Sequence, residues 1–405
     1  MAKRITGGRP TTAAERSALS RRRFLGTSGL ALGGLAMGPA LLAACSSSDS
    51  EGASGGGGSS TGEQVWFDNW TLYIDQPDDD LYGAGGTLDE FQKATGLKIK
   101  YTEDFNDNNE YFAKIQPLLS KGEPIGPNVI APTFWLAGRL ITLGWVDKLP
   151  LDKIPNSSNL LESLTKPPSD PTGEYSLPWQ SGMAGIAYNK AAAGGEVLTM
   201  EQLFSPELKG KVGMLTEMRD TIGLIAMSEG IDLDTPTFEK FQPAFAKLEQ
   251  AVADGQIRQF TGNDYIDDLE QGNFAACIGW SGDVAQLSLS NPDIGFAIPE
   301  SGGTLWFDTM VIPAGASNVD DVAEWMNFVY DPVNAAKITA YVQYISPVQG
   351  VQDELRKLGG DDAALADNQL IFPDASTLAN LQSWGNLDEA EEQLFDEEFA
   401  RITGA

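Results

Sequence analysis

The strongest constraint on the fold is an alternation of short apolar runs with amphipathic runs that begins near residue 65. An apolar run at 65–67 is followed by TLDEFQKAT at 87–95, whose apolar side chains recur at helical spacing, and then by alternating residues at 97–101. These periods predict strand, helix and strand in that order. Gly96, directly after the helical run, is typical of a helix end.

The same order continues for most of the chain. Short strands are predicted at 128–131, 211–215 and 274–280, longer extended segments at 175–188 and 305–313, and helices at 109–119, 136–143, 238–253 and 319–330. This β–α–β–α succession predicts an α/β fold with a mainly parallel sheet. A chain of 405 residues is also long enough to form two lobes.

Residues 1–44 have the pattern of an export signal. Three consecutive arginines, at 21–23, precede an apolar run that is diluted by Gly and Ala. Paired arginines ahead of such a run are typical of twin-arginine export. The alternative is a membrane-spanning helix that is retained, since the run is about 20 residues long, as a span requires. Its Gly and Pro content favours the signal.

The run ends in Leu42-Ala43-Ala44-Cys45, which resembles the lipobox of bacterial lipoproteins. That resemblance implies that Cys45 is acylated and becomes the first residue of the mature chain. Residues 45–63 are rich in Gly and Ser and would form a flexible tether. An ordinary free thiol at Cys45 is the alternative.

The amino-acid composition excludes several classes of function. The chain has 27 Lys and Arg against 57 Asp and Glu, which argues against nucleic-acid binding and favours cationic partners. It has no histidine, so it lacks the Ser-His-Asp triad and the histidine ligands of most catalytic zinc sites. We expect no metal and no cofactor. Cys277 is the only other cysteine, which leaves the folded body without a disulfide.

The chain resembles the extracellular solute-binding proteins of ABC importers, and among them the spermidine/putrescine-binding group. The resemblance is spread over residues 64–385. It is carried, in order, by 69–73, 87–101, 175–178, 207–211, 280–282, 306–308, 312–314, 331–332 and 372–375.

The resemblance implies a two-lobed periplasmic-binding-protein fold of type II, with the ligand held in the cleft between lobes joined by crossing strands. Lobe one would comprise 64–183 and 309–350, and lobe two 184–308 and 351–405. The crossings would fall near 179–185, near 307–310 and after Pro347.

The resemblance also implies the ligand-binding residues. They would be Trp70, Tyr73, Asp75, Thr133, Trp135, Glu217, Asp220, Trp280, Trp306, Asp308 and Tyr344. Aromatic faces and carboxylates are the groups that hold alkylammonium ions. Trp306 and Asp308, two residues apart on one strand face, are expected to stack on and pair with the ligand.

Several positions depart from the group. Leu72 stands where the group has an acid, and Asp75 is a candidate to take over the role of that acid. Pro132 and Phe134 stand where the group has a hydroxyl residue and a tyrosine. Glu217 and Asp220 are equal candidates for the acids of the 215–220 segment. Arg219 would pair with either acid or with an anionic group of the ligand. Gln382 and Trp384 are both candidates for the place of a family glutamine.

These observations predict a non-enzymatic receptor that binds a small cationic solute, foremost a polyamine, and delivers it to an ABC permease and its ATPase. We expect a monomer anchored by Cys45 to the outer face of the cytoplasmic membrane or in the periplasm. The alternatives are a receptor for an amino-acid derivative, sugar or cofactor precursor, an exported carboxylate-pair hydrolase, and a surface adhesin or scaffold.

Overall fold

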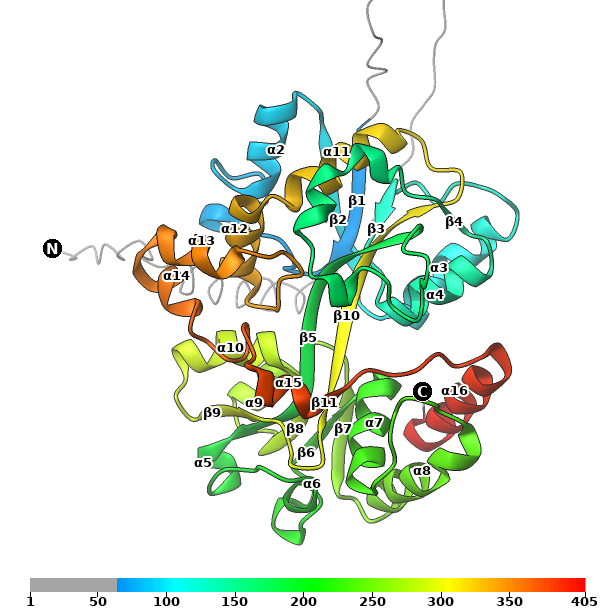
Figure 1. The fold of residues 1–405 in the computed structure, drawn as a ribbon. Coiled ribbons are helices and arrows are strands. Elements are labelled where there is room, and N and C mark those ends of the chain that lie inside the picture. The colour runs from blue at the N-terminus through cyan, green and yellow to red at the C-terminus, as the bar shows by residue number, and fades with distance from the viewer. Residues whose placement is uncertain (1–63, 405) are drawn as a thin grey trace, which may run out of the picture.

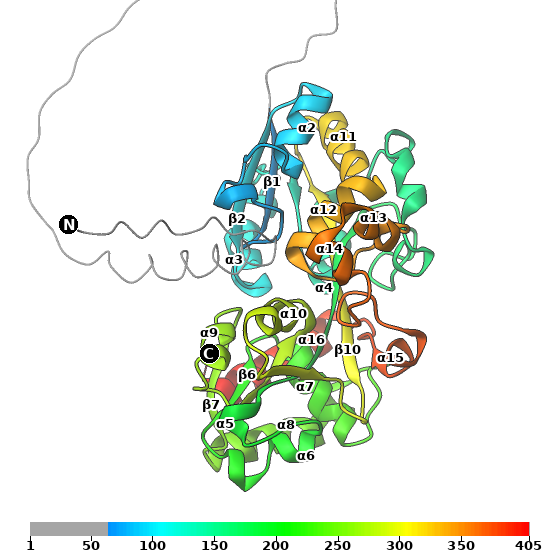
Figure 2. The same ribbon diagram turned by 90° about the vertical axis from the view of Figure 1, so that its left-hand side faces the viewer.

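Two long strands run through the molecule and join its two lobes (Figure 1). The structure is a computed structural model that describes residues 64–404, so the predicted export signal, Cys45 and the predicted tether lie outside the described residues. Strand β5 (Ser176–Asn189) pairs antiparallel with β10 (Gly303–Pro313). Viewed from the side, one lobe lies above the other with β10 between them (Figure 2). The predicted extended segments are therefore the crossing strands.

The upper lobe of Figure 1 is built on three parallel strands. β1 (Val65–Trp70) lies between β2 (Ile99–Phe105) and β3 (Val129–Ile130), and β3 continues the sheet to β10. Its helices are α2 (Thr87–Thr95), α3 (Asn108–Leu119), α4 (Phe134–Thr142), α11 (Val319–Val329), α12 (Pro332–Val342), α13 (Val351–Leu358) and α14 (Gly360–Leu365). A short strand, β4 (Val146–Asp147), also pairs with β10.

The lower lobe continues the same sheet on the other side of β5. β8 (Ala276–Trp280) pairs antiparallel with β5 and parallel with β6 (Val212–Leu215), which pairs parallel with β7 (Ile257–Thr261). The edge strands are β9 (Ile294–Ala297) and β11 (Leu381–Gln382). The helices are α5 (Lys190–Ala193), α6 (Met200–Leu203), α7 (Met218–Ser228), α8 (Phe238–Ala253), α9 (Tyr265–Glu270), α10 (Ser281–Ser290), α15 (Ala375–Ala379) and α16 (Glu389–Thr403). The predicted α/β class is confirmed.

Capping residues explain why several helices begin and end where the sequence predicted. α2 ends at Gly96, which has a φ of 75° and donates its N–H to Gln92. This left-handed conformation suits glycine because glycine has no Cβ. α8 begins after Thr237, whose hydroxyl accepts the N–H of Lys240.

Two groups of buried side chains form the core. One packs α2, α11 and α12 against the β1 sheet around Phe67 and Trp325. The other runs from α3 and α4 into the lower lobe, and the stacked rings of Phe134 and Phe307 lie within it, with centroids 4.9 Å apart. Apolar packing is therefore continuous from α4 to the crossing strand β10.

Residues 351–371 pack differently from the predicted lobe division. α13 and α14 bury Val351, Leu355 and Leu365 in the same core group as α12, in the upper lobe. The chain joins the lower lobe only afterwards, where β11 pairs with Gly303 and Thr304 of β10. The third passage between the lobes thus follows residue 371, not Pro347, because the apolar face of α13 is covered by α12.

Replacing Phe67 with alanine is expected to lower the free energy of unfolding by about 3–5 kcal/mol. Its ring is fully buried in edge-to-face contact with Tyr101 and Trp179. The shift of the urea midpoint measures the loss. Leu289→Ala, at a side chain that is 52% exposed, is the control and should change stability by about 0.5 kcal/mol or less. Equal midpoints for the two variants would contradict this role of Phe67.

Candidate ligand-binding site

The ends of strands from both lobes meet around a cavity of about 270 Å³. Its walls come from the segment after β1, the start of α4, the start of α7, the end of β8 and the crossing strand β10. Cavities at domain interfaces and at the carboxyl ends of parallel strands are typical ligand sites. All predicted ligand residues except Asp75 line it: Trp70, Tyr73, Thr133, Trp135, Glu217, Asp220, Trp280, Trp306, Asp308 and Tyr344.

Asp308 is a buried carboxylate held by two neutral hydroxyls. Its Oδ1 accepts a hydrogen bond from Thr133 Oγ1 at 2.7 Å, and its Oδ2 accepts one from the Tyr73 hydroxyl at 2.9 Å. The pairing of β10 with β5 is irregular between Phe307 and Thr309, which is the position of Asp308. Such irregularities redirect side chains near binding sites. Burial raises the pKa of Asp308 to about 7, against an ordinary value of 3.8.

Asp220 forms a second carboxylate of the same kind. Its Oδ1 accepts the Thr304 hydroxyl at 2.6 Å, and its Oδ2 accepts the Trp280 indole N–H at 2.7 Å. Burial raises its pKa, although both hydrogen bonds and, to a smaller extent, the charge of Arg219 act to lower it. Two carboxylates with neutral partners thus face one cavity, and a desolvated carboxylate is stabilised by a cation.

Aromatic rings surround these carboxylates. Trp306 lies edge-on to Tyr344 at 5.4 Å between ring centroids, and Tyr344 lies edge-on to Tyr73 at 5.5 Å. Glycine makes this arrangement possible, because a Cβ at Gly282 would lie 2.6 Å from the Tyr344 ring. The rings offer apolar walls and cation-attracting faces.

Glu217 and Arg219 lie at the start of α7. The Glu217 carboxylate accepts the N–H of Arg219 at 3.2 Å, and burial raises its pKa to about 8. Arg219 does not pair with Asp220. It donates to Glu392 of α16 at 2.8 Å, and its guanidinium carbon lies 4.1 Å from the ring centroid of Trp135.

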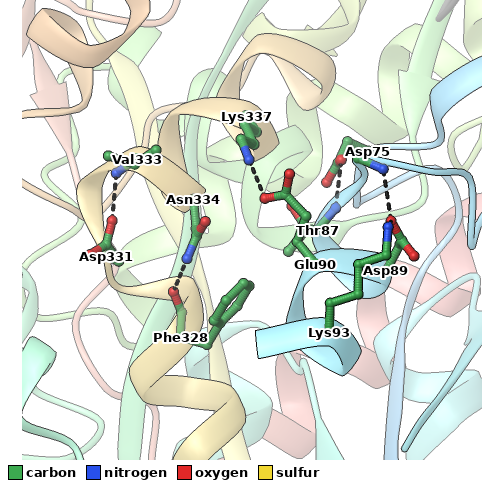
Figure 3. Close-up of polar contacts among 11 residues, drawn as sticks. Asp75, Thr87, Asp89, Glu90, Lys93, Phe328, Asp331, Val333, Asn334 and Lys337 are labelled. Carbon is green, nitrogen blue, oxygen red and sulfur yellow. Dashed lines mark hydrogen bonds and ion pairs between the residues drawn. The ribbon is translucent and has the colours of Figure 1, made fainter. Parts of the chain in front are cut away.

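Asp75 has a different place from the one predicted. Its Oδ2 accepts the N–H of Thr87 at 2.9 Å, at the first residue of α2 (Figure 3). A carboxylate at a helix N-terminus is stabilised by the helix dipole. The same view shows Lys337 of α12 bound to Glu90 of α2. Asp75 therefore fastens the segment after β1 to α2 and does not replace the acid absent at Leu72.

Several cavity residues were missed by the sequence analysis. Asp283 is buried, lines the cavity and accepts the Tyr265 hydroxyl at 3.0 Å. Its position in the first turn of α10, three residues after Trp280, was an available signal. Asn108 also lines the cavity and donates to Thr133 at 2.9 Å, which orients the partner of Asp308. Of the two C-terminal candidates, Trp384 lines the cavity.

Comparison with known proteins agrees with this geometry. The profile of the bacterial extracellular solute-binding protein family matches residues 87–371. This chain belongs to that family. Its members are solute-binding receptors of ABC importers rather than enzymes, and they take a small-molecule ligand and a permease with its ATPase as partners.

Individual relatives point in the same direction. A putrescine-binding periplasmic protein of Pseudomonas aeruginosa is 31% identical, with 68% of this chain and 76% of the relative covered. Spermidine/putrescine-binding periplasmic protein 1 of Haemophilus influenzae is 26% identical, with 90% and 96% covered. A solved structure from Listeria monocytogenes, described as a spermidine/putrescine ABC transporter, aligns with a TM-score of 0.72 at 27% identity, covering 84% of this chain and 98% of that one. The predicted family and the two-lobed fold are confirmed.

Within residues 64–404 of this solute-binding protein, no group of three or more His, Cys, Asp or Glu side chains has an arrangement suited to a metal ion. In the same range no helix has the length and apolar character needed to span a membrane.

The stability of the ligand-free protein is expected to fall as pH rises from about 4 to about 7. In this window folded Asp308 keeps a proton that the unfolded chain has lost, because its pKa is about 7 when folded and 3.8 ordinarily. Since the folded state binds more protons, its stability decreases with pH. The difference between the urea midpoints at pH 5 and pH 7.5 measures this slope of stability against pH. Asp308→Asn should reduce the slope, and the raised pKa values of Glu217 and Asp220 account for the part that remains.

The matched control for this slope is Asp320→Asn, because the Asp320 side chain is 72% exposed. This variant should keep the wild-type slope. If Asp308→Asn also keeps the wild-type slope, the raised pKa of Asp308 is wrong.

Proposed function

We propose that this solute-binding protein captures a polyamine such as putrescine or spermidine and presents it to an ABC permease. The observation that supports this most directly is the pair Asp220 and Asp308, two buried cavity carboxylates whose hydrogen-bond partners are neutral hydroxyl and indole groups. An alkylammonium ion supplies the missing positive charge through charge-assisted hydrogen bonds. The aromatic rings of Trp306, Trp280 and Tyr344 provide flat walls for its methylenes.

The two lobes give the mechanism of capture. Tyr73 and Thr133 belong to the upper lobe, whereas Asp220 and Trp280 belong to the lower lobe. A ligand that touches both sets binds the closed arrangement better than an open one and shifts the population toward it. The permease would then recognise the closed form of a monomeric receptor.

A polyamine is expected to raise the melting temperature of the purified protein. At about 100 times the dissociation constant the gain is roughly 2.7 kcal/mol. Asp308→Asn should weaken affinity by about tenfold to a hundredfold, since a hydrogen bond to a charged group contributes about 1.5–3 kcal/mol. Thermal shift and calorimetry against putrescine, spermidine, spermine, amino acids, sugars and thiamine provide the measurement.

Asp320→Asn again provides the control and should bind like the wild type, because Asp320 is exposed on α11 and does not line the cavity. A response to a sugar or an anion alone would leave the solute-binding role intact and reject the polyamine as ligand.

We further propose that twin-arginine export precedes lipidation at Cys45, which ties the protein to the membrane through the tether at 45–63. The paired arginines and the Leu-Ala-Ala-Cys ending are the supporting features. Stable anchoring takes more than one lipid chain, as bacterial lipoproteins carry.

Cys45→Ser is expected to move the protein from the membrane fraction to the soluble fraction and to abolish incorporation of labelled palmitate. Cys277→Ala provides the control, because Cys277 is the buried cysteine of the folded body. This variant should stay in the membrane fraction. Continued membrane association of Cys45→Ser would show that another segment anchors the chain.

A further inference from the structure

The side chain of Arg219 is a cation built into the wall of the cavity. The residue is only 7% exposed, although it lines the cavity. Its Nη2 donates to Glu392 Oε1 at 2.8 Å, and its charge also acts to lower the pKa values of Glu217, Asp220 and Asp396. One guanidinium is thus ion-paired with Glu392 and acts electrostatically on three more acidic side chains of the lower lobe.

The guanidinium of Arg219 also reaches the other lobe. Its central carbon lies 4.1 Å from the ring centroid of Trp135, at the start of α4, whereas Arg219 itself belongs to α7 (Figure 1). A guanidinium over a tryptophan face at this distance is a cation–π contact. Trp135 was predicted to offer this aromatic face to the ligand, and in the structure the side chain of Arg219 covers it.

We propose that Arg219 is a specificity-determining residue, a resident cation that fills one cation-binding end of the cavity and keeps a ligand ammonium group away from Trp135. The proposal rests on the proposed function. The ammonium groups of the ligand are then left with Asp308 and Asp220, so the wild-type cavity favours a diamine over a longer amine that needs a third cation site.

Compensation of the Arg219 charge argues against a role in binding an anionic ligand group. Glu392 is itself largely buried, with 13% of its side chain exposed, and forms a direct ion pair with Arg219. A ligand carboxylate would have to compete with Glu392 for the guanidinium.

Removing Arg219 should therefore create a cation site. The vacated space would open onto the cavity and would be lined by the Trp135 face and by Glu217, Glu392 and Asp396, which are the groups that an ammonium ion requires. Arg219→Ala is expected to raise the affinity for spermidine relative to that for putrescine by about tenfold. A gain of this order is expected from a cation–π contact together with charge-assisted hydrogen bonds to carboxylates.

Calorimetry on the purified full chain gives both affinities, and the readout is the ratio of spermidine to putrescine affinity. Arg219→Lys keeps a cation at this place and should keep the wild-type ratio. Because Arg219→Ala leaves Glu392 without its partner and can destabilise the fold, a second variant combines Arg219→Ala with Glu392→Gln. This double variant retains the Trp135 face and should still raise the ratio of spermidine to putrescine affinity, but by less than Arg219→Ala alone.

Each outcome decides the proposal. A raised ratio in Arg219→Ala or in the double variant, together with an unchanged ratio in Arg219→Lys, supports it. An unchanged ratio in folded variants, or an equal loss of both amines, overturns it while the polyamine function stands. If the wild type binds neither amine, the proposed function fails and the inference fails with it.

Discussion

The desolvation of Asp308 and Asp220 is the constraint on which the site depends. A carboxylate taken out of water is costly unless hydrogen bonds and a positive charge compensate it. Here the hydrogen bonds come from Thr133, Tyr73, Thr304 and Trp280, all neutral donors. In the proposed function a cationic ligand supplies the remaining compensation, which agrees with a cavity that combines raised carboxyl pKa values with aromatic walls.

The same constraint couples ligand binding to lobe closure. Asp308 lies on a crossing strand, and both of its hydroxyl partners come from the upper lobe. Asp220 and its partner Trp280 come from the lower lobe. In the proposed function the charge that a cation neutralises is therefore shared by the two lobes, and full compensation requires that they approach one another. A ligand with positive charge thus gains most of its binding energy in the closed arrangement.

Local signals predicted much of the fold. α2 and α8 were predicted with the bounds that the structure has, because each combines an amphipathic face with a capping residue. α7 was not predicted as a helix, because nearly all of its residues are buried and no polar face marks its period. The placement of 351–371 was also wrong, since it depends on which helix covers the apolar face of α13, a tertiary contact.

The cavity residues that lie on a strand were predictable from the sequence, because alternation along a strand gives the direction of each side chain. The direction of a side chain that follows a turn was not predictable. Trp306 and Asp308 reach the cavity from one strand, as their spacing indicated. Asp75 comes after a turn in which Leu72 has a φ of 56°, and no rule of spacing gives the direction of the side chains that follow such a residue.

Arg219 places a resident positive charge in the wall of the cavity. From the resemblance to the family, Trp135 and Glu217 are predicted to bind the ligand. In the folded protein Arg219 covers the Trp135 face and acts electrostatically on Glu217, and α16 holds Arg219 in place through Glu392. Charge inside a closed cavity acts strongly because the surroundings screen it weakly. If Arg219 acts as we propose, the number of ammonium groups that this receptor accepts depends on the carboxylates that Arg219 leaves uncompensated, rather than on all the carboxylates that line the cavity.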